Sequence, residues 1–208
     1  MFHDRRSQFM FLFGIGVLAV IVAVISLVYV LKKCKHGTYP KQKKIGLAVT
    51  ALGGTLLHFL YDWLGEAIWI APFSGINEST WEHMKLLFWP MFIYAIVQSF
   101  FFRDYNGFWC VKLIGTLVGL SLIPILFYTY NGVIGPSPDW INIAIFFISA
   151  AIAYIYETRL FNSGNLRCRS QRLAIGILAV IGLLFVIFTF STPEIGIFKD
   201  PLTGTYGI

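Results

Sequence analysis

Charged residues are scarce in this chain. Only 12% of its 208 residues are Asp, Glu, Lys or Arg, and 57% are hydrophobic, whereas a soluble domain has about 25% charged residues. The mean hydropathy is correspondingly high, at +0.73. So few charges exclude an ordinary soluble domain, and we expect a lipid bilayer to surround most of the surface.

Cysteine is also scarce, and the three cysteines lie far apart. Cys34, Cys110 and Cys168 form no CxxC pair, so their spacing predicts neither a disulfide framework nor a thiolate metal site and fits a reducing or membrane-embedded setting. The sequence has no Gly-rich phosphate loop, nucleotide motif or internal repeat. The net charge of +6 comes from short basic segments between apolar runs, so we expect no nucleic-acid partner.

Six apolar runs are long enough to cross a bilayer, which needs about 20 helical residues. They predict an all-α fold, a polytopic membrane helix bundle with six transmembrane helices in a single membrane domain. The predicted helices cover residues 9–31, 45–70, 82–102, 108–130, 140–161 and 173–190. The first run ends in lysines without a small-residue cleavage pattern, so we expect a retained helix rather than a signal peptide.

Basic residues mark two of the connections between these helices. Because Lys and Arg gather on the cytoplasmic side of membrane proteins, both connections are predicted to be cytoplasmic. Segments 71–81 and 131–139 contain neither residue, which predicts a multi-pass protein of the cell (plasma) membrane with both termini and the tail 191–208 non-cytoplasmic. The basic residues are Lys32, Lys33, Lys35, Lys41, Lys43, Lys44, Arg159, Arg167, Arg169 and Arg172.

The second predicted helix carries an unusual polar stripe. His58, Asp62 and Glu66 recur at intervals of four and therefore share one helical face. A charged Asp near the bilayer centre costs about 2.5–3.5 kcal/mol, so such groups normally face the bundle interior and mark a site or pathway. A structural explanation is that His58 and Asp62 satisfy each other. We favour function, because one structural contact does not need three ionisable groups.

The connection that follows is equally polar. Ser79 and Glu82 match a capping box, with Ser79 as N-cap and Glu82 reaching back to it. Capping explains neither Lys85, which could snorkel outward, nor His83, which lies one turn into the helix and is free to point at the second helix. The candidate ligand- or proton-binding residues are His58, Asp62, Glu66, Asn77, Glu78, Glu82 and His83.

Two stretches of the chain resemble a known family. Residues 77–83 read NESTWEH and are followed by KLLFWP at 85–90, and residues 200–207 read DPLTGTYG. With the spacing of His58 and Asp62, they resemble the signature of a prokaryotic family of small six-helix integral membrane proteins of unknown function. The resemblance runs over nearly the whole chain and implies a fold and the place of a site, but no reaction.

A metal-dependent membrane hydrolase is one candidate function, because imidazole and carboxylate groups bind zinc and similar divalent ions. The candidate metal ligands are His58, Asp62, His83 and Glu82. Depth is the objection: if the second helix continued to residue 70, His58 would lie roughly 18 Å below its end. His83 starts near the surface, so it meets Asp62 or Glu66 more easily than His58 unless the second helix ends early around Gly65.

A transporter or an assembly protein would also fit a polytopic membrane fold. A path from Glu66 to His58 stops halfway, because Lys112 lies near the cytoplasmic end of its helix and Glu157 is expected to pair with Arg159 at the surface. The tail 191–208 could bind a protein partner, whose identity the residues do not indicate. We therefore predict an outward-facing polar cavity between the second and third helices that binds a small ligand, ion or proton.

Overall fold

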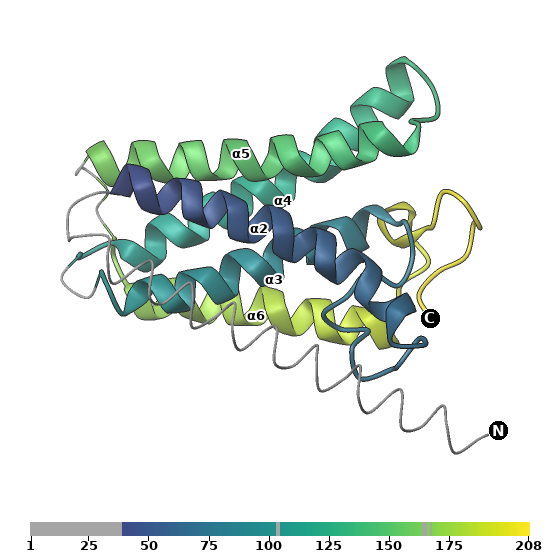
Figure 1. The fold of residues 1–208 in the computed structure, drawn as a ribbon, viewed down its shortest axis with the longest axis horizontal. Coiled ribbons are helices and arrows are strands. Elements are labelled where there is room, and N and C mark those ends of the chain that lie inside the picture. The colour runs from purple at the N-terminus through teal and green to yellow at the C-terminus, as the bar shows by residue number, and fades with distance from the viewer. Residues whose placement is uncertain (1–38, 103–104, 164–165, 167) are drawn as a thin grey trace. The chain divides into compact units, whose positions relative to one another are not determined.

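The computed structural model describes residues 39–102, 105–163, 166 and 168–208. Across these residues the chain is helical, with five α-helices and one short 3-10 helix (Figure 1). Their bounds are α2 Tyr39–Trp63, α3 Thr80–Ser99, α4 Phe108–Val133, α5 Asp139–Ser163, α6 Gln171–Phe190 and η1 Gly196–Phe198. The first predicted transmembrane helix, residues 9–31, lies outside the described residues.

Four helices are long and apolar enough to cross a membrane, namely α2, α4, α5 and α6. The helix α3 differs because its first two turns carry Glu82, His83 and Lys85. The predicted all-α class is thus confirmed, while six transmembrane helices remain a prediction. The second predicted helix has different bounds from those expected, since α2 begins at Tyr39 and ends at Trp63 rather than covering residues 45–70.

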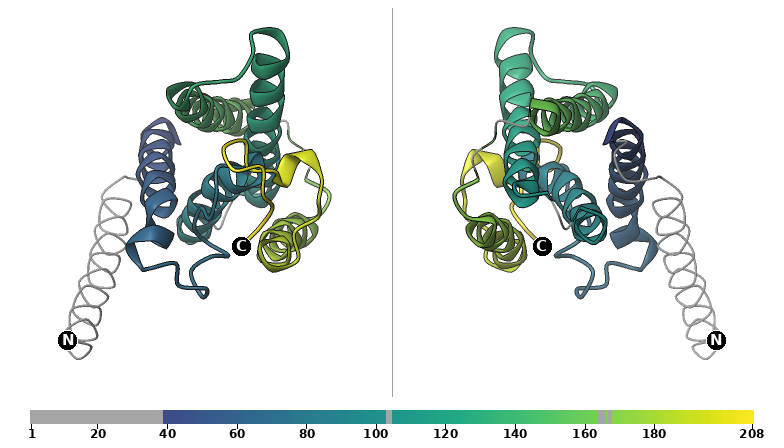
Figure 2. Two further views of the ribbon diagram at one scale, coloured as in Figure 1. Left: turned by 90° about the vertical axis from the view of Figure 1, so that its right-hand side faces the viewer. Right: turned by 90° about the vertical axis from the view of Figure 1, so that its left-hand side faces the viewer.

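The helices α2 to α6 pack side by side, and consecutive helices run in opposite directions (Figures 1 and 2). The helix α5 packs along α4 and also contacts α2, while α3 contacts α2, α4 and α6. The starts of α2, α4 and α6 therefore lie at one end of this bundle. The connection from α2 to α3 and the C-terminal tail lie at the other end (Figure 2).

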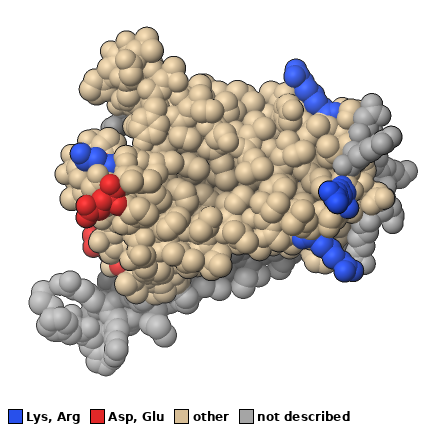
Figure 3. Space-filling view, turned by 180° about the vertical axis from the view of Figure 1, so that it is seen from behind, with Lys and Arg blue, Asp and Glu red and all other residues tan. Residues whose placement is uncertain are grey.

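On the face that Figure 3 shows, the described Lys, Arg, Asp and Glu side chains gather at these two ends and leave an uncharged band between them. We call the end formed by the starts of α2, α4 and α6 the basic end, and the opposite end the acidic end. The basic end carries Lys43, Lys44, Arg159, Arg169 and Arg172, and the acidic end carries Asp62, Glu66, Glu78, Glu194, Lys199 and Asp200. An apolar belt between charged ends is the surface that a bilayer requires.

Small residues allow the helices to approach closely. A Cβ atom at Gly119 of α4 would lie 2.8 Å from Leu87 Cδ2 and 3.2 Å from Ala153 Cβ, and one at Gly115 would overlap the Glu157 side chain. A Cβ atom at Gly53 of α2 would lie 3.0 Å from Pro90 Cβ. These glycines pack against helices of the same chain, as expected for small residues at helix contacts.

A buried ion pair joins α4 and α5. The Lys112 Nζ and Glu157 Oε2 atoms lie 2.6 Å apart, and both side chains are almost fully buried. The rings of Tyr94 and Tyr154 each lie 5.6 Å from the same Nζ atom. The predicted surface pairing of Glu157 with Arg159 is therefore wrong, because α5 turns Glu157 toward α4, where Gly115 leaves space for it.

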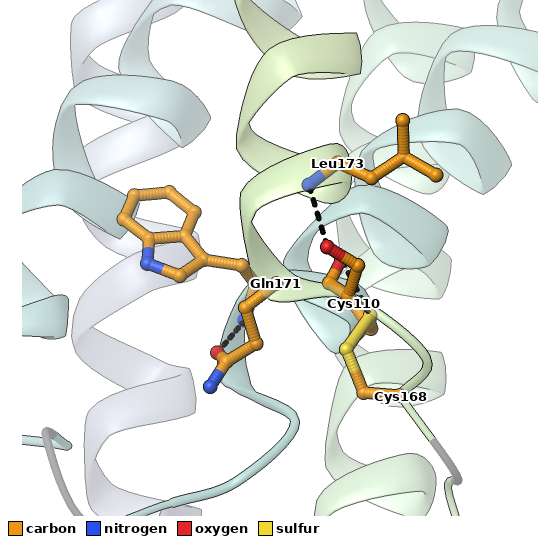
Figure 4. The surroundings of a disulfide bond; sticks show 6 residues. Cys110, Cys168, Gln171 and Leu173 are labelled. Carbon is orange, nitrogen blue, oxygen red and sulfur yellow. Dashed lines mark hydrogen bonds between the residues drawn. A yellow bond between two sulfur atoms is a disulfide. The ribbon is translucent and has the colours of Figure 1, made fainter.

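A disulfide bond closes the basic end. Cys110, near the start of α4, bonds Cys168, which precedes α6, and their Cα atoms lie 5.9 Å apart (Figure 4). Beside it, the Trp109 backbone N–H donates to the Gln171 side chain and the Ser170 hydroxyl accepts from the Leu173 N–H. The prediction that the cysteine spacing indicates no disulfide is wrong for Cys110 and Cys168, because folding brings together residues separated by 58 positions. Cys34 lies outside the described residues.

We predict that Gly115→Ala destabilises the protein. The added methyl group would push Glu157 from Lys112, and overpacking of this kind costs about 1–3 kcal/mol. The matched control is Gly176→Ala on α6, where an added Cβ meets no atom within 4 Å. Thermal unfolding in detergent should show a clear loss of Tm for Gly115→Ala and none for Gly176→Ala. Equal Tm values would contradict the packing at Gly115.

If Cys110 and Cys168 form a disulfide, their sulfur atoms should react with a maleimide only after reduction. In a Cys34→Ser variant, denatured without reductant, we expect no addition of a polyethylene-glycol maleimide, because both remaining thiols are bonded to each other. After reduction, both should react and give two mass shifts on a gel. Two additions before reduction would show that the bond does not form.

Candidate functional site

The early end of α2 shapes the site. Gly65 and Glu66 have left-handed backbone conformations, with φ of 66° and 59°. The Gly65 N–H donates to the Asp62 carbonyl at 3.0 Å and the Glu66 N–H donates to the Tyr61 carbonyl at 2.9 Å. These two bonds form a Schellman motif with glycine at its preferred position, and they satisfy carbonyl groups at the helix end.

This ending corrects the predicted polar stripe. Glu66 lies beyond the helix, and both Asp62 and Glu66 are exposed. His58 lies about 7.5 Å from the helix end at 1.5 Å per residue, rather than at the depth expected for a helix reaching residue 70. The objection that His58 lies too deep to meet His83 therefore no longer holds.

The connection from α2 to α3 folds back onto α2. The Ser74 hydroxyl accepts from the Tyr61 N–H at 2.9 Å and donates to the Leu57 carbonyl. The Gly75 N–H donates to the same carbonyl at 3.2 Å, and a Cβ atom at Gly75 would lie 3.5 Å from His58 Nδ1. The loop is thereby held close to His58, which positions Glu78 beside it.

The start of α3 sets the direction of the next side chains. Ser79 is the N-cap, as predicted, and its hydroxyl accepts from the Glu82 N–H at 3.4 Å. The reciprocal half of the capping box is wrong, because the Ser79 N–H donates to Asn77 Oδ1 at 2.9 Å. Glu82 turns inward instead, where its carboxylate accepts from the Ile76 N–H at 3.1 Å.

Glu82 pairs with Lys85, which therefore does not snorkel outward as predicted. The Nζ and Oε2 atoms lie 2.5 Å apart, the Lys85 side chain is fully buried, and that of Glu82 is nearly so. Lys85 also donates to the Ala71 carbonyl at 2.7 Å and to the Thr189 hydroxyl at 3.3 Å. This pair ties α3 to the preceding loop and to α6, so Glu82 belongs to the structural core rather than to the open site.

His58, Glu78 and His83 come together at the acidic end. The His58 Nε2 atom lies 3.5 Å from Glu78 Oε1, and the His83 Nε2 atom lies 3.6 Å from Glu78 Oε2. The two imidazole ring centroids are 6.0 Å apart. One carboxylate therefore faces two imidazoles, each with a different oxygen.

The tautomer of His83 follows from its other contact. The His83 Nδ1 atom lies 3.0 Å from the Ser79 carbonyl oxygen, which only accepts hydrogen bonds, so the proton of the neutral ring belongs on Nδ1. The Nε2 atom of that neutral ring then has a lone pair facing the Glu78 carboxylate. Attraction at this position requires a proton, or the donor group of a ligand, between the two side chains.

These three side chains line a cavity of about 310 Å³ between α2, α3 and α5. The predicted cavity lay between the second and third helices only, and α5 supplies a wall that the sequence did not indicate. The tail adds Leu202 to the lining. The remaining lining residues are Gly54, Thr55, Phe59, Leu86, Asn142, Ile143, Phe146 and Phe147.

The tail is folded against this end of the bundle (Figure 2). Lys199 and Tyr206 form an antiparallel bridge, and the Asp200 carboxylate accepts from the Leu202 N–H at 2.8 Å within the turn. The side chain of Asn77, a predicted site residue, donates to the Gly207 carbonyl at 3.3 Å. Asn77 therefore holds the tail instead of lining the cavity.

The structure thus brings together three of the seven predicted site residues. In the part of the chain that the structure describes, no group of three or more His, Cys, Asp and Glu side chains is arranged to hold a metal ion. Sequence reasoning missed Thr55 and Asn142, which carry no motif, and Leu202, which lies in the quoted stretch 200–207 but was not recognised as a site residue. Asn142 and Leu202 reach the cavity only because α5 and the tail pack beside it.

We predict that the buried ion pair, rather than Glu78, maintains stability. Lys85→Met leaves the Glu82 carboxylate buried without its cation, which costs about 3–5 kcal/mol. The Tm in detergent of Glu78→Gln, and that of the exposed control Lys199→Met, should lie close to the Tm of wild type. The double variant Glu82→Gln/Lys85→Met should recover part of the loss. A Tm for Lys85→Met equal to that of Lys199→Met would overturn this assignment.

Comparison with known proteins places the chain in a family. Residues 31–208, which include α2 to α6 and the tail, match a family of unknown function, DUF6512. Searches of curated proteins and of solved structures found no match. The match covers most of the chain, as the resemblance in its sequence implied. The chain therefore belongs to the DUF6512 family, whose function is unknown.

Proposed function

We propose that this chain is an integral membrane protein that binds a small ligand in the cavity between α2, α3 and α5. The observation that carries the proposal is the position of Glu78, whose carboxylate faces His58 and His83 on the wall of a mostly apolar cavity. Small-molecule sites typically combine apolar walls with a few convergent polar groups.

The contrast with the two buried ion pairs supports a binding role. Lys85 with Glu82 and Lys112 with Glu157 are closed contacts of 2.5 and 2.6 Å between buried groups. The contacts of Glu78 are about 1 Å longer, and its side chain is 36% exposed. Contacts this long between partly exposed groups contribute little to stability, and they leave the carboxylate open to a donor group of a ligand.

The distribution of charge supports an orientation. With the basic end in the cytoplasm, the cavity opens on the non-cytoplasmic side of the plasma membrane, and the tail 191–208 lies on that side as well. The Cys110–Cys168 disulfide at the basic end weighs against this orientation, because such bonds are rare in the reducing cytoplasm. This orientation follows the excess of Lys and Arg at one end of the bundle. If α3 crosses the membrane together with α2, α4, α5 and α6, the predicted helix over residues 9–31 makes six transmembrane helices and gives a non-cytoplasmic N-terminus.

The hydrolase, transporter and assembly functions have less support. For the hydrolytic metal site, no group of three His, Cys, Asp or Glu side chains among the described residues is arranged to hold a metal ion. Of its predicted ligands, Glu82 is engaged by Lys85 and Asp62 lies exposed. A proton path toward the basic end gains nothing from Lys112 and Glu157, because these two groups neutralise each other. An assembly role has no specific contact to support it, because the tail folds on its own bundle.

Native mass spectrometry of the protein released from native membranes tests the proposal. We expect wild type to retain a small molecule that Glu78→Gln and His83→Ala lose, because both variants remove a polar contact of the cavity. Glu194→Gln, which removes an exposed carboxylate at the same end, is the matched control and should retain it. Retention in all four proteins, or in none, would contradict binding through Glu78.

Metal analysis of the same samples distinguishes the metal-dependent hydrolase from the binding of an organic ligand. Near-stoichiometric zinc or iron in wild type, lost in His58→Ala and His83→Ala, would favour the metal-dependent hydrolase over the binding of an organic ligand.

A further inference from the structure

Building on the proposed function, we infer that the ligand is a single-chain amphiphile with a hydroxyl or amine head group, which enters from the bilayer between α2 and α5. The inference rests on three properties of the cavity: where its apolar wall lies, which charges line it, and how large it is.

The apolar wall continues onto the lipid-facing surface. Phe59 of α2 and Ile143 and Phe147 of α5 line the cavity, and their exposed fractions lie between 39% and 55%. The two helices that carry them are long and apolar enough to cross a membrane. In a bilayer, side chains exposed at this level meet acyl chains, so a hydrocarbon tail can pass from lipid to the cavity without crossing water.

The charges of the lining select the head group. Among the described residues that line the cavity, the ionisable side chains are His58, Glu78 and His83, and none is Lys or Arg. Phosphate and carboxylate groups are normally bound by Arg or Lys, so this lining disfavours both. A hydroxyl or ammonium group can instead donate to the Glu78 carboxylate, which only accepts.

The volume of the cavity selects the number of chains. About 310 Å³ lies at the lower end of the range of about 300–1,000 Å³ for small-molecule sites. This space suits one hydrocarbon chain better than the two chains of a phospholipid. The turn of the tail places Leu202 on the cavity, so the lining at the acidic end also has an apolar contact for the ligand.

Photolabelling in phosphatidylcholine nanodiscs tests this inference. The probes are a long-chain primary amine and the matching alcohol, each with a diazirine in the alkyl chain, and the fatty acid of the same length serves as the head-group control. Peptide mass spectrometry should find label from the amine and the alcohol on residues 54–59 and 142–147. The fatty acid should label these residues about tenfold less, because its carboxylate meets Glu78 without a cation.

Two pairs of variants assign the label to the cavity. Glu78→Gln should reduce labelling about tenfold or more, since it removes a hydrogen bond to a charged group, while Glu194→Gln should not. Thr55→Trp fills the cavity and should reduce labelling to background. Leu52→Trp, one turn earlier on the exposed surface of α2, is the matched control and should label as wild type does.

The outcomes separate this inference from the proposed function. The inference that the ligand is an amphiphile would be wrong if label were spread over all lipid-facing helices. It would also be wrong if labelling survived both Glu78→Gln and Thr55→Trp. If native mass spectrometry then still found a water-soluble molecule that depends on Glu78, the binding function alone would stand. Equal labelling by the fatty acid would overturn the assignment of the head group.

Discussion

The turn that ends α2 at Gly65 and Glu66 is the constraint on which the candidate site depends. A non-glycine residue in the left-handed region costs roughly 1–2 kcal/mol, and Glu66 adopts that conformation because the Schellman hydrogen bonds satisfy the helix end. If α2 continued, residues 64–70 would extend it and the loop could not return to Ser74. The short helix therefore allows Glu78 to reach His58.

The loop that returns is then held by α3. Lys85 donates to the Ala71 carbonyl and the Trp89 indole N–H donates to the Pro72 carbonyl at 3.0 Å, so two side chains of α3 satisfy loop carbonyls. In an apolar environment a carbonyl without a partner is costly, so these bonds select one loop conformation. Glu82 keeps Lys85 in place and thereby contributes to the site indirectly.

The charged groups of this bundle consequently fall into two kinds, buried ion pairs that join helices and the partly exposed Glu78 carboxylate. The closed pairs, Glu82 with Lys85 and Lys112 with Glu157, join helices and lie away from the surface. Among the described residues, Glu78 has no Lys or Arg side chain as close, and two imidazoles share its carboxylate. The proposed ligand binding requires a carboxylate that can change partners, which the closed pairs cannot do without destabilising the bundle.

The sequence by itself determined the features that depend on neighbouring residues. Apolar runs predicted the helices, Ser79 predicted the start of α3, and the basic segments predicted an end of the bundle rich in Lys and Arg. Gly65 was also a local signal for an early end of α2, which stayed an alternative to the apolar run that continues to residue 70. These features are readable because each is set by contacts within a few turns of the chain.

Only the tertiary structure decided which distant side chains meet. Lys112 meets Glu157, Cys110 bonds Cys168, and α5 completes the cavity with Asn142. The helices α4 and α5, which carry Lys112, Glu157, Cys110 and Asn142, are apolar on most of their circumference, so periodicity does not show which face turns inward. That choice depends on glycines such as Gly115, which let one helix accept the side chain of another, and therefore on the packing of the whole bundle.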